Sequence, residues 1–268
     1  MKYYLFLIFF TKIFCFNNDY NFIFKSQCNK DSYSIKNKIT NEIDLINIIS
    51  TFKYQKFSIF SQKNCVTKLP VAPKENDILA WFTKKERYIF TLLLTKCKKY
   101  LEFGMGGSTL LAYMTSNIQK IISVESDLKW INIIRNFKNL KKEEGERIIL
   151  EYIDIGNTSY WGIPLTNEKK KNFPNYSKQV FKKYKNDYDL VFIDGIFRVA
   201  CTLQAILNCK RDTKIIIHDF NYKYYYHILY KYMDVIYSID TLVIFSIKED
   251  IDIEEIKLDY ENYKNDPR

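Results

Sequence analysis

The fold is decided by the stretch YLEFGMGGST, residues 100–109. Its apolar beginning is typical of a buried strand, which ends near an acidic residue, Glu102, and a Gly-x-Gly-Gly turn. A helix then opens at Ser108. Glycines let a backbone approach a ligand closely, and the first turn of a helix offers free N–H groups. The stretch therefore predicts a strand, a ligand-binding turn and a helix.

The glycine turn differs from two common nucleotide-binding patterns. It is not a Walker A loop, because no Gly-Lys-Ser or Gly-Lys-Thr follows Gly104, Gly106 and Gly107. It also departs from the dinucleotide pattern Gly-x-Gly-x-x-Gly, since Thr109 stands where the third glycine belongs. The turn is a candidate cofactor site, in which Glu102 would either accept a hydrogen bond from a cofactor ammonium group or order the loop.

Further apolar runs on both sides of this stretch lack strict alternation, which is typical of parallel strands covered by helices on both faces. The expected strands are Tyr100–Phe103, Ile121–Glu125, Ile148–Ile153, Leu190–Asp194 and Lys214–His218. The expected helices run from Asn76 to Leu94 and over Ser108–Thr115, Leu128–Lys138, Tyr176–Tyr184, Arg198–Asn208 and Lys223–Met233. Two closing runs, Val235–Ile239 and Thr241–Ile247, predict an antiparallel hairpin. The predicted fold class is therefore α/β: a Rossmann-like, doubly wound, mostly parallel sheet of seven strands with a terminal antiparallel hairpin.

An acidic residue ends the strand that follows the glycine turn. Glu125 lies 19 residues after Gly106. A carboxylate at this offset can accept both ribose hydroxyls of an adenosine. Glu125 is therefore a candidate cofactor-binding residue.

The fourth and fifth expected strands also end in polar side chains. Asp194 closes the fourth strand with Arg198 close behind it, and His218-Asp219 closes the fifth. In open α/β sheets this edge is the crevice that binds ligands. Asp194 and Asp219 could hold a Mg²⁺-type ion through carboxylate oxygens, or one residue could act as a base, with His218 the better-tuned group near neutral pH. Alternatively, the two aspartates cap the helices that follow. Arg198 is a candidate substrate contact.

A long connection leads from Asp154 to about Tyr176. Loops of this length in a compact domain are often lids or substrate walls. Within it, Tyr160 and Trp161 would either stack on a flat substrate or pin the loop. Trp161 is the candidate substrate contact.

The basic composition does not identify a polyanion partner. The formal charge is +10, but the lysines are spread along the chain among acidic residues. Lys, Asn, Ile, Tyr and Phe all have AT-rich codons, so codon bias alone could explain much of their abundance. A Tyr-rich run at 222–227 would point in several directions on a helix, so we expect no specific nucleic-acid partner. No Cys/His spacing suits zinc.

The N-terminus carries the marks of a targeting signal. Lys2 precedes an apolar run, residues 3–16, which is too short to span a bilayer comfortably. We expect a signal peptide or signal anchor at 1–16, entry into the secretory pathway or an organelle reached through it, and membrane contact only if this segment is not cleaved. The alternative is a buried N-terminal element in a cytoplasmic protein. Residues 17–72 are expected to form an extension of uncertain order, 73–248 the Rossmann-like domain, and 249–268 a charged tail.

The chain from about 76 to 247 resembles class I S-adenosylmethionine-dependent methyltransferases. Within them it is similar to a branch that carries four runs, found here at Tyr100–Thr109, Val124–Asp127, Asp154–Gly162 and Asp194–Cys201. The resemblance implies that the methionine part of the cofactor is surrounded by Glu102, Gly104, Gly106 and Ser108. It also implies that Glu125 holds the ribose and that Asp154 faces the adenine.

The same resemblance bears on metal binding. Asp194 and Asp219 match metal ligands of catechol-type O-methyltransferases, but Phe220 stands where those enzymes often carry Asn or Asp. We therefore expect transfer of a methyl group from S-adenosylmethionine to a small-molecule acceptor, with an O-methyltransferase favoured and Mg²⁺ a candidate second cofactor. The alternatives are an NAD(P)-dependent oxidoreductase and a non-catalytic Rossmann-like binding module.

Overall fold

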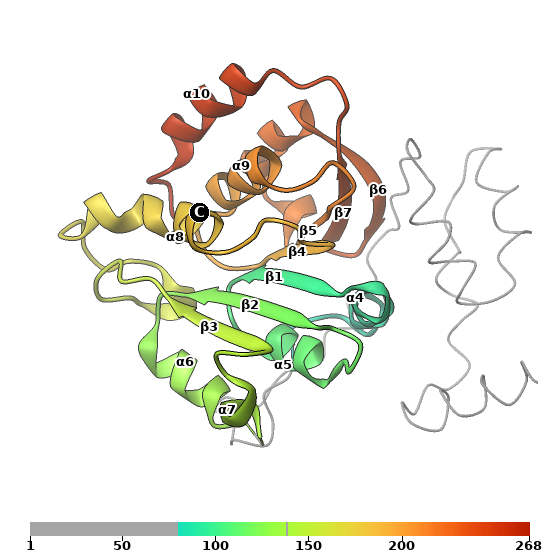
Figure 1. Cartoon of the computed structure of the whole chain (residues 1–268). Helices are drawn as coiled ribbons and strands as arrows, with labels where there is room; N and C mark the ends of the chain where they lie inside the picture. Colours follow the sequence, from blue (N-terminus) through green and yellow to red (C-terminus); the bar gives the residue numbers. More distant parts are fainter. Residues whose placement is uncertain (1–79, 138) are drawn as a thin grey trace, which may run out of the picture. The chain divides into compact units, whose positions relative to one another are not determined.

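A computed structural model describes residues 80–137 and 139–268, which form one seven-stranded sheet with helices on both faces (Figure 1). The strands are β1 (Lys99–Phe103), β2 (Lys120–Glu125), β3 (Ile148–Tyr152), β4 (Leu190–Ile193), β5 (Lys214–Ile217), β6 (Met233–Ile239) and β7 (Leu242–Ile247). The α-helices are α4 (Lys84–Lys96), α5 (Gly107–Met114), α6 (Leu128–Arg135), α7 (Leu140–Glu143), α8 (Phe173–Lys183), α9 (Arg198–Asn208) and α10 (Ile253–Tyr263). Short 3₁₀ helices are η2 (Tyr160–Gly162), η3 (Lys170–Asn172), η4 (Phe220–Tyr222) and η5 (Tyr224–Lys231).

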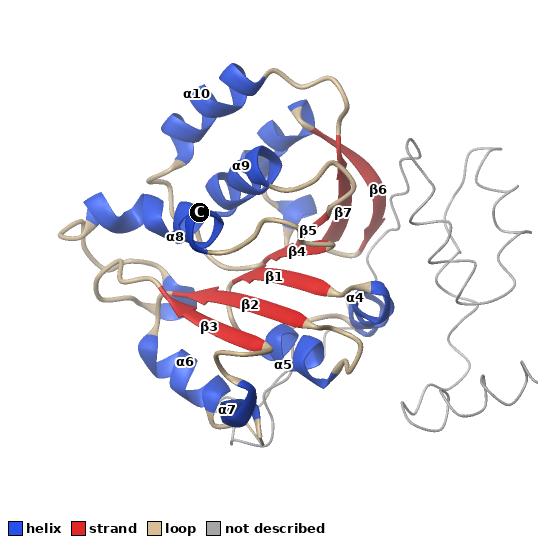
Figure 2. Cartoon of the chain, viewed as in Figure 1, coloured by secondary structure: helices blue, strands red, loops and turns tan. Residues whose placement is uncertain are grey.

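The strand order is β3-β2-β1-β4-β5-β7-β6 (Figure 2). Strands β1 to β5 pair in parallel, and β7 pairs antiparallel with both β5 and β6. The order reverses between β2-β1 and β4-β5, so the carboxyl ends of β1 and β4 flank a topological switch point. The predicted fold class, including the terminal hairpin, is confirmed.

Alternate residues of each strand face different helices, because successive side chains of a strand point to opposite faces. On one face, Phe90 of α4 contacts the rings of Tyr100 in β1 and Phe192 in β4. On the other, Phe103 of β1 contacts Tyr176 and Phe181 of α8. Both faces are therefore buried, which explains why the sequence shows apolar runs rather than alternation.

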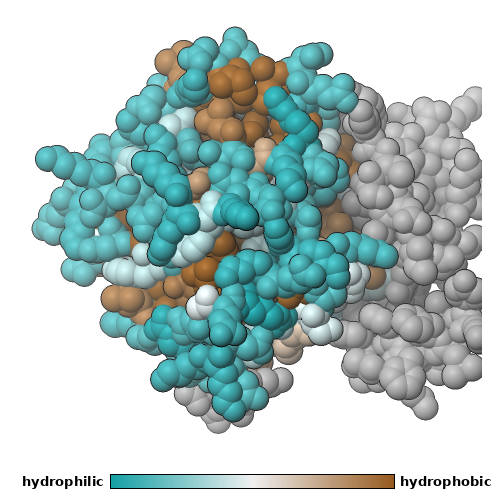
Figure 3. All heavy atoms as spheres, in the orientation of Figure 1, coloured by the Kyte–Doolittle hydropathy of each residue, from teal (hydrophilic) through white to brown (hydrophobic). Residues whose placement is uncertain are grey.

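Hydrophilic residues cover most of the molecular face seen in Figure 3, and apolar residues reach the surface where α10 lies over α9. Helix α10 (Ile253–Tyr263) lies within the segment 249–268, which the sequence suggested as a charged tail. Ile256 and Tyr260 of this helix are buried in the same core as α8 and α9. The charged positions of the segment form only one side of an amphipathic helix, which hid its packing role.

The chain after α10 returns to the beginning of α9. Phe197, the N-cap of α9, has φ 54° and no side-chain capping bond. Instead, the backbone oxygens of Pro267 and Arg268 accept hydrogen bonds from the amides of Phe197 and Arg198. Backbone of the last residues thus satisfies donors that have no partner inside the helix.

Two helices differ most from expectation, one in type and one in its start. The run expected as a helix over Lys223–Met233 is the 3₁₀ helix η5, in which Tyr226 and Leu229 are buried. A spacing of three residues stacks side chains on a 3₁₀ helix, and tyrosine has only modest α-helix propensity. Helix α4 begins at Lys84, because Thr83 and Glu86 form a capping box there.

The predicted signal segment, 1–16, and the extension, 17–72, lie outside the described residues. Within the described ranges, the structure has no helix of the length and apolarity that a membrane crossing requires.

Candidate cofactor and acceptor site

The glycine turn after β1 contains two glycines with different physical roles. Gly104 has φ +96°, and a Cβ built on it would lie 2.4 Å from the backbone nitrogen of Gly195, so only glycine fits where the β1 and β4 ends touch. Gly106 is different, because a Cβ there would meet nothing within 4 Å. Gly107 is the first residue of α5. The turn therefore presents open space at Gly106, directly before a helix N-terminus.

Glu102 lies beneath this turn and is fully buried. Its carboxylate accepts hydrogen bonds from Ser108, Thr109, Ser123 and Tyr100. Burial raises the pKa of Glu102, and these hydroxyl donors partly oppose that rise, leaving a pKa of about 7. Glu102 thus orders the turn and the start of α5, the second of its two expected roles. Ser108, expected beside the cofactor, directs its hydroxyl to Glu102.

Glu125 closes β2 beside the turn and is also buried. Its Oε1 accepts from the amides of Ser126, at 2.6 Å, and Asp127, at 3.0 Å, and from the Ser126 hydroxyl. Its Oε2 accepts from the amide of Met105, at 3.1 Å, which lies within the glycine turn. Burial raises the pKa of Glu125, and the amide donors oppose it. The carboxylate is thus fixed against the turn, and Oε2 keeps capacity for a further donor.

The long loop after β3 is closed at its base by Asp154. The Asp154 carboxylate pairs with Lys169 at 2.5 Å and accepts from the amide of Gly156, while its backbone oxygen accepts from Asn172. The Asp154 side chain is 43% exposed, and Lys169 and the Gly156 amide lower its pKa. These contacts bring the two ends of the loop together. The Asp154 carboxylate is paired with Lys169, so a ligand that contacts Asp154 would also lie beside Lys169.

The tip of this loop lies over the carboxyl ends of β2 and β4. A Cβ on Gly162 would lie 3.6 Å from Glu125 Oε1 and 4.0 Å from Ile196. The adjacent Trp161 has φ 64°, an uncommon conformation for a large residue, and is 73% exposed. Its ring meets that of Trp81, just before α4, edge-on at a centroid distance of 5.6 Å. Two indoles thus join the loop to the α4 segment beside Glu125.

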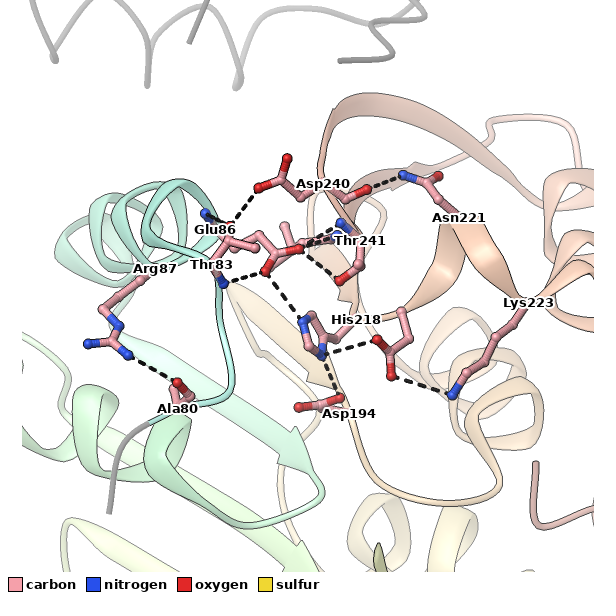
Figure 4. Close-up of polar contacts among 12 residues, drawn as sticks. Ala80, Thr83, Glu86, Arg87, Asp194, His218, Asn221, Lys223, Asp240 and Thr241 are labelled. Carbon is pink, nitrogen blue, oxygen red and sulfur yellow. Dashed lines mark hydrogen bonds and ion pairs between the residues drawn. The ribbon is translucent and has the colours of Figure 1, made fainter. Parts of the chain in front are cut away.

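Asp194, His218 and Asp219 come together as the sequence predicted, at the ends of β4 and β5. Figure 4 shows Asp194 beside the ring of His218. His218 Nδ1 lies 3.0 Å from Asp194 Oδ1 and 4.0 Å from Asp219 Oδ1. Lys223 lies 3.4 Å from the other Asp219 oxygen. Asp219 has φ 58°, a left-handed conformation that costs energy for a residue with a Cβ.

Sequence reasoning missed Glu86. This residue of α4 is 1% exposed, and its Oε2 lies 3.6 Å from His218 Nε2. Its Oε1 accepts from the amide and hydroxyl of Thr241, the residue before β7 (Figure 4). It also accepts from the amide of Leu242, the first residue of β7. The Thr83-x-x-Glu86 pattern signals a capping box, but only the fold shows that the same carboxylate reaches a strand 155 residues away.

Three carboxylates around His218 favour its protonated form. Burial lowers its pKa, but Asp194, Glu86 and Asp219 raise it more strongly, to about 10. An imidazolium has no free lone pair, so His218 does not take up a proton near pH 7. Within this cluster, the carboxylates are the groups that can accept a proton.

The cluster does not fit a divalent cation. Arg198 already bridges its two carboxylates: Nη2 lies 3.2 Å from Asp194 Oδ1, and Nη1 lies 3.4 Å from Asp219 Oδ2. His218 and Lys223 add two further positive groups. Phe220, the residue after Asp219, offers no ligand atom in its side chain, is completely buried and stacks on Tyr226. A metal ion bound to both aspartates would have to displace the buried Arg198 guanidinium. Arg198 therefore occupies the position between the two carboxylates that a metal ion would take.

We expect Mg²⁺ to leave the thermal unfolding midpoint of the full-length chain unchanged, because a ligand raises that midpoint only by binding the folded state. The measurement is a thermal melt with added Mg²⁺ and, separately, with EDTA. A rise with Mg²⁺ that EDTA reverses would contradict this expectation.

The Arg198 guanidinium is also unavailable to substrate. Besides the two aspartates, it donates to the backbone oxygens of Gly195 and His218. Its exposed fraction is 9%. The structure thus places Arg198 under the site rather than in it.

Comparisons with known proteins identify the fold of this chain. No protein-family model matches the sequence, and no curated protein matches it. The structure is similar to a methyltransferase-like protein from Silicibacter pomeroyi, with a TM-score of 0.61 and 22% identity, over 71% of this chain and 98% of that one. The chain has a methyltransferase-like fold. An O-methyltransferase from Bacillus cereus in complex with SAH is a more remote match, with a TM-score of 0.42 and 15% identity, over 62% of this chain and 82% of that one.

Within the methyltransferase-like fold, the candidate residues fall into two neighbouring groups. Glu125, the glycine turn and the loop tip lie around the ends of β1 and β2. Asp194, His218 and Asp219 lie at the ends of β4 and β5. The contact between the backbones of Gly104 and Gly195 joins the two groups.

Proposed function

We propose that the protein transfers a methyl group from S-adenosylmethionine to a small-molecule acceptor. The observation that carries the proposal is the open space at Gly106 next to a fixed, buried carboxylate, Glu125. A nucleoside needs a place where it can approach the backbone closely and an acceptor for its ribose hydroxyls. The glycine turn offers the first, and Glu125, which is hydrogen-bonded to that turn, offers the second. The likeness to a methyltransferase-like protein supports the proposal at the level of fold.

S-adenosylmethionine would supply a methyl group on a sulfonium, and the chain's residues would position the acceptor. Glu125 Oε2 would accept a ribose hydroxyl, and the turn at Gly106 would contact the methionine part. Asp194, across the Gly104–Gly195 contact, would orient the hydrogen of the acceptor. Because methyl transfer is an in-line displacement, such alignment is the main contribution required of the protein.

The acceptor side is bounded by the loop tip and the α4 segment. Trp161 and Trp81 meet edge-on with exposed fractions of 73% and 49%. Exposed indoles offer flat apolar surface that a planar molecule can cover. Their position beside Glu125, through Gly162, suits a small acceptor held over the crevice better than an extended polymer.

We expect the full-length chain to bind S-adenosylmethionine and S-adenosylhomocysteine with micromolar affinity, and Glu125→Ala to weaken both by roughly 10- to 100-fold. Hydrogen bonds to a charged group contribute about 1.5–3 kcal/mol, which is that range in affinity. Isothermal titration calorimetry measures both values, with NAD⁺ as the competing cofactor.

Glu254→Ala is the matched control, because Glu254 is 80% exposed on α10 and pairs only with Lys257 among the contacts described. Preferential binding of NAD⁺ would favour an oxidoreductase. Absence of binding by a folded chain would favour a non-catalytic module. Either result would reject methyl transfer.

A further inference from the structure

Glu86 is a buried charge that the proposed cofactor site does not use. Among the described residues, the polar groups in contact with its carboxylate are donors: Thr83 and the Thr241–Leu242 turn hold its two oxygens, and His218 faces Oε2. Although burial opposes ionisation, contact with His218 and these donors keeps the pKa of Glu86 below its usual value. A buried carboxylate with this set of partners is ionised and immobile.

Both ring nitrogens of His218 face a carboxylate. Nδ1 lies 3.0 Å from Asp194, and Nε2 lies 3.6 Å from Glu86, on opposite sides of the ring (Figure 4). A neutral imidazole has only one N–H, so it would turn a lone pair toward one of the two carboxylates. The doubly protonated ring satisfies both. Phe82, from the segment before α4, packs edge-on against the ring at a centroid distance of 5.2 Å and fixes its plane.

The consequence reaches Asp194. Its Oδ1 is held by His218 and by Arg198 Nη2 at 3.2 Å. Within the part of the chain that the structure describes, Oδ2 receives no hydrogen bond, and the side chain is 25% exposed. The carboxylate is therefore fixed through one oxygen and free at the other, which is the arrangement needed to orient a ligand hydrogen.

We propose that Glu86 is a positioning residue, which holds His218 as a doubly protonated ring and thereby directs Asp194 Oδ2 at the acceptor. The statement that Asp194 meets the acceptor rests on the proposed methyl transfer. The Glu86–His218–Asp194 arrangement itself is independent of the ligand. It links α4 to the ends of β5 and β4, so a helix far from the glycine turn sets the geometry of the acceptor side.

The charges that face His218 come from every element packed around it. Glu86 is on α4, Asp194 follows β4, and Asp219 follows β5; the two cations beyond them are Arg198 of α9 and Lys223 of the segment after η4. Of these, only Glu86 lies on the Nε2 side of the ring. Removing the charge of Glu86 should therefore weaken the binding of the proton on Nε2.

The test is ¹⁵N NMR of the histidine rings in the full-length chain. The chain has two histidines, so in His227→Gln the only remaining histidine ring signals are those of His218. At pH 8 we expect both ring nitrogens of His218 to carry a proton. In Glu86→Gln we expect the titration midpoint of His218 to fall by about 1 unit or more, as removal of one nearby opposite charge implies.

Glu86→Asp keeps the charge but moves it further from His218, so it should lower the His218 titration midpoint less than Glu86→Gln does. Glu254→Gln should not lower it. A wild-type ring with one proton at pH 8 would overturn the proposal. An unchanged midpoint in a folded Glu86→Gln would also overturn it, because Asp194 and Asp219 would then suffice. If Glu86→Gln does not fold, Glu86→Asp carries the comparison, and an unchanged midpoint there overturns the proposal.

Binding of S-adenosylhomocysteine is measured on the same samples. We expect Glu86→Gln to bind it within about threefold of wild type, because Glu86 is not part of the glycine turn or of the Glu125 contacts. Failure of the wild-type chain to bind it would reject methyl transfer while leaving the NMR result intact. The two proposals can therefore fail separately.

Discussion

Gly104→Ala is expected to lower the free energy of unfolding by at least about 3 kcal/mol, whereas Gly106→Ala changes it by no more than about 1 kcal/mol. The added Cβ at 104 would lie 2.4 Å from the Gly195 nitrogen and sit at φ +96°, and neither backbone can move without parting β1 from β4. The added Cβ at 106 meets nothing within 4 Å. Urea unfolding of both variants measures the difference.

The same pair separates folding from ligand binding. A methyl group at residue 106 would fill the space assigned to the cofactor, so Gly106→Ala should weaken binding of S-adenosylhomocysteine by roughly tenfold or more while remaining folded. Unchanged binding in Gly106→Ala would place the cofactor elsewhere. Unchanged stability in Gly104→Ala would mean that the close Gly104–Gly195 contact does not exist.

The second large effect is a pH dependence that originates at Glu102. Burial raises the pKa of this carboxyl from 4.5 to about 7. Between these values the folded protein keeps a proton that the unfolded chain has released. The contribution of Glu102 to stability is therefore fully present below pH 4.5 and declines as the pH rises toward about 7, by a total of about 3 kcal/mol.

Glu102→Gln should remove that decline, because an amide has nearly the same shape and does not ionise. The measurement is the unfolding free energy of wild type and variant at about pH 5, near the lower end of the window, and at about pH 8, above its upper end. Glu254→Gln, at an exposed position, should keep the wild-type slope. An equal slope in Glu102→Gln and wild type would show that Glu102 is already ionised at pH 5.

Most strands and helices of this domain could be predicted from the sequence because they depend on local pattern, but α7 and α10 were not predicted and Lys223–Met233 is not an α-helix. The start of β1 and the whole of α9 agree with expectation to within a residue, since apolar runs bounded by Gly, Asp or Asn define them. The partnerships of charged side chains could not be predicted in this way. Glu86 accepts a hydrogen bond from Thr241, 155 residues away in the sequence. The Arg198 guanidinium lies between Asp194 and Asp219 and contacts both.

Residue type alone favoured His218 as a base, whereas Phe220 already spoke against a metal site. An isolated histidine titrates near neutral pH, which favours a role as base, but three carboxylates around this one move its pKa to about 10. Phe220 departs from the metal-ligand pattern, and the structure gives the physical counterpart: the ring is in the core, and Arg198 bridges the two aspartates. Such outcomes depend on which groups meet in space.

The position of β7 between β5 and β6 has a consequence for synthesis on the ribosome. Until residues 242–247 emerge, β5 has an open edge, which is prone to pair with other chains. The Glu86 carboxylate also lacks its Thr241 and Leu242 donors until then, and the start of α9 waits for Pro267 and Arg268. We therefore expect nascent chains stalled before about residue 240 to remain protease-sensitive and to depend on chaperones, with protection appearing in one late step.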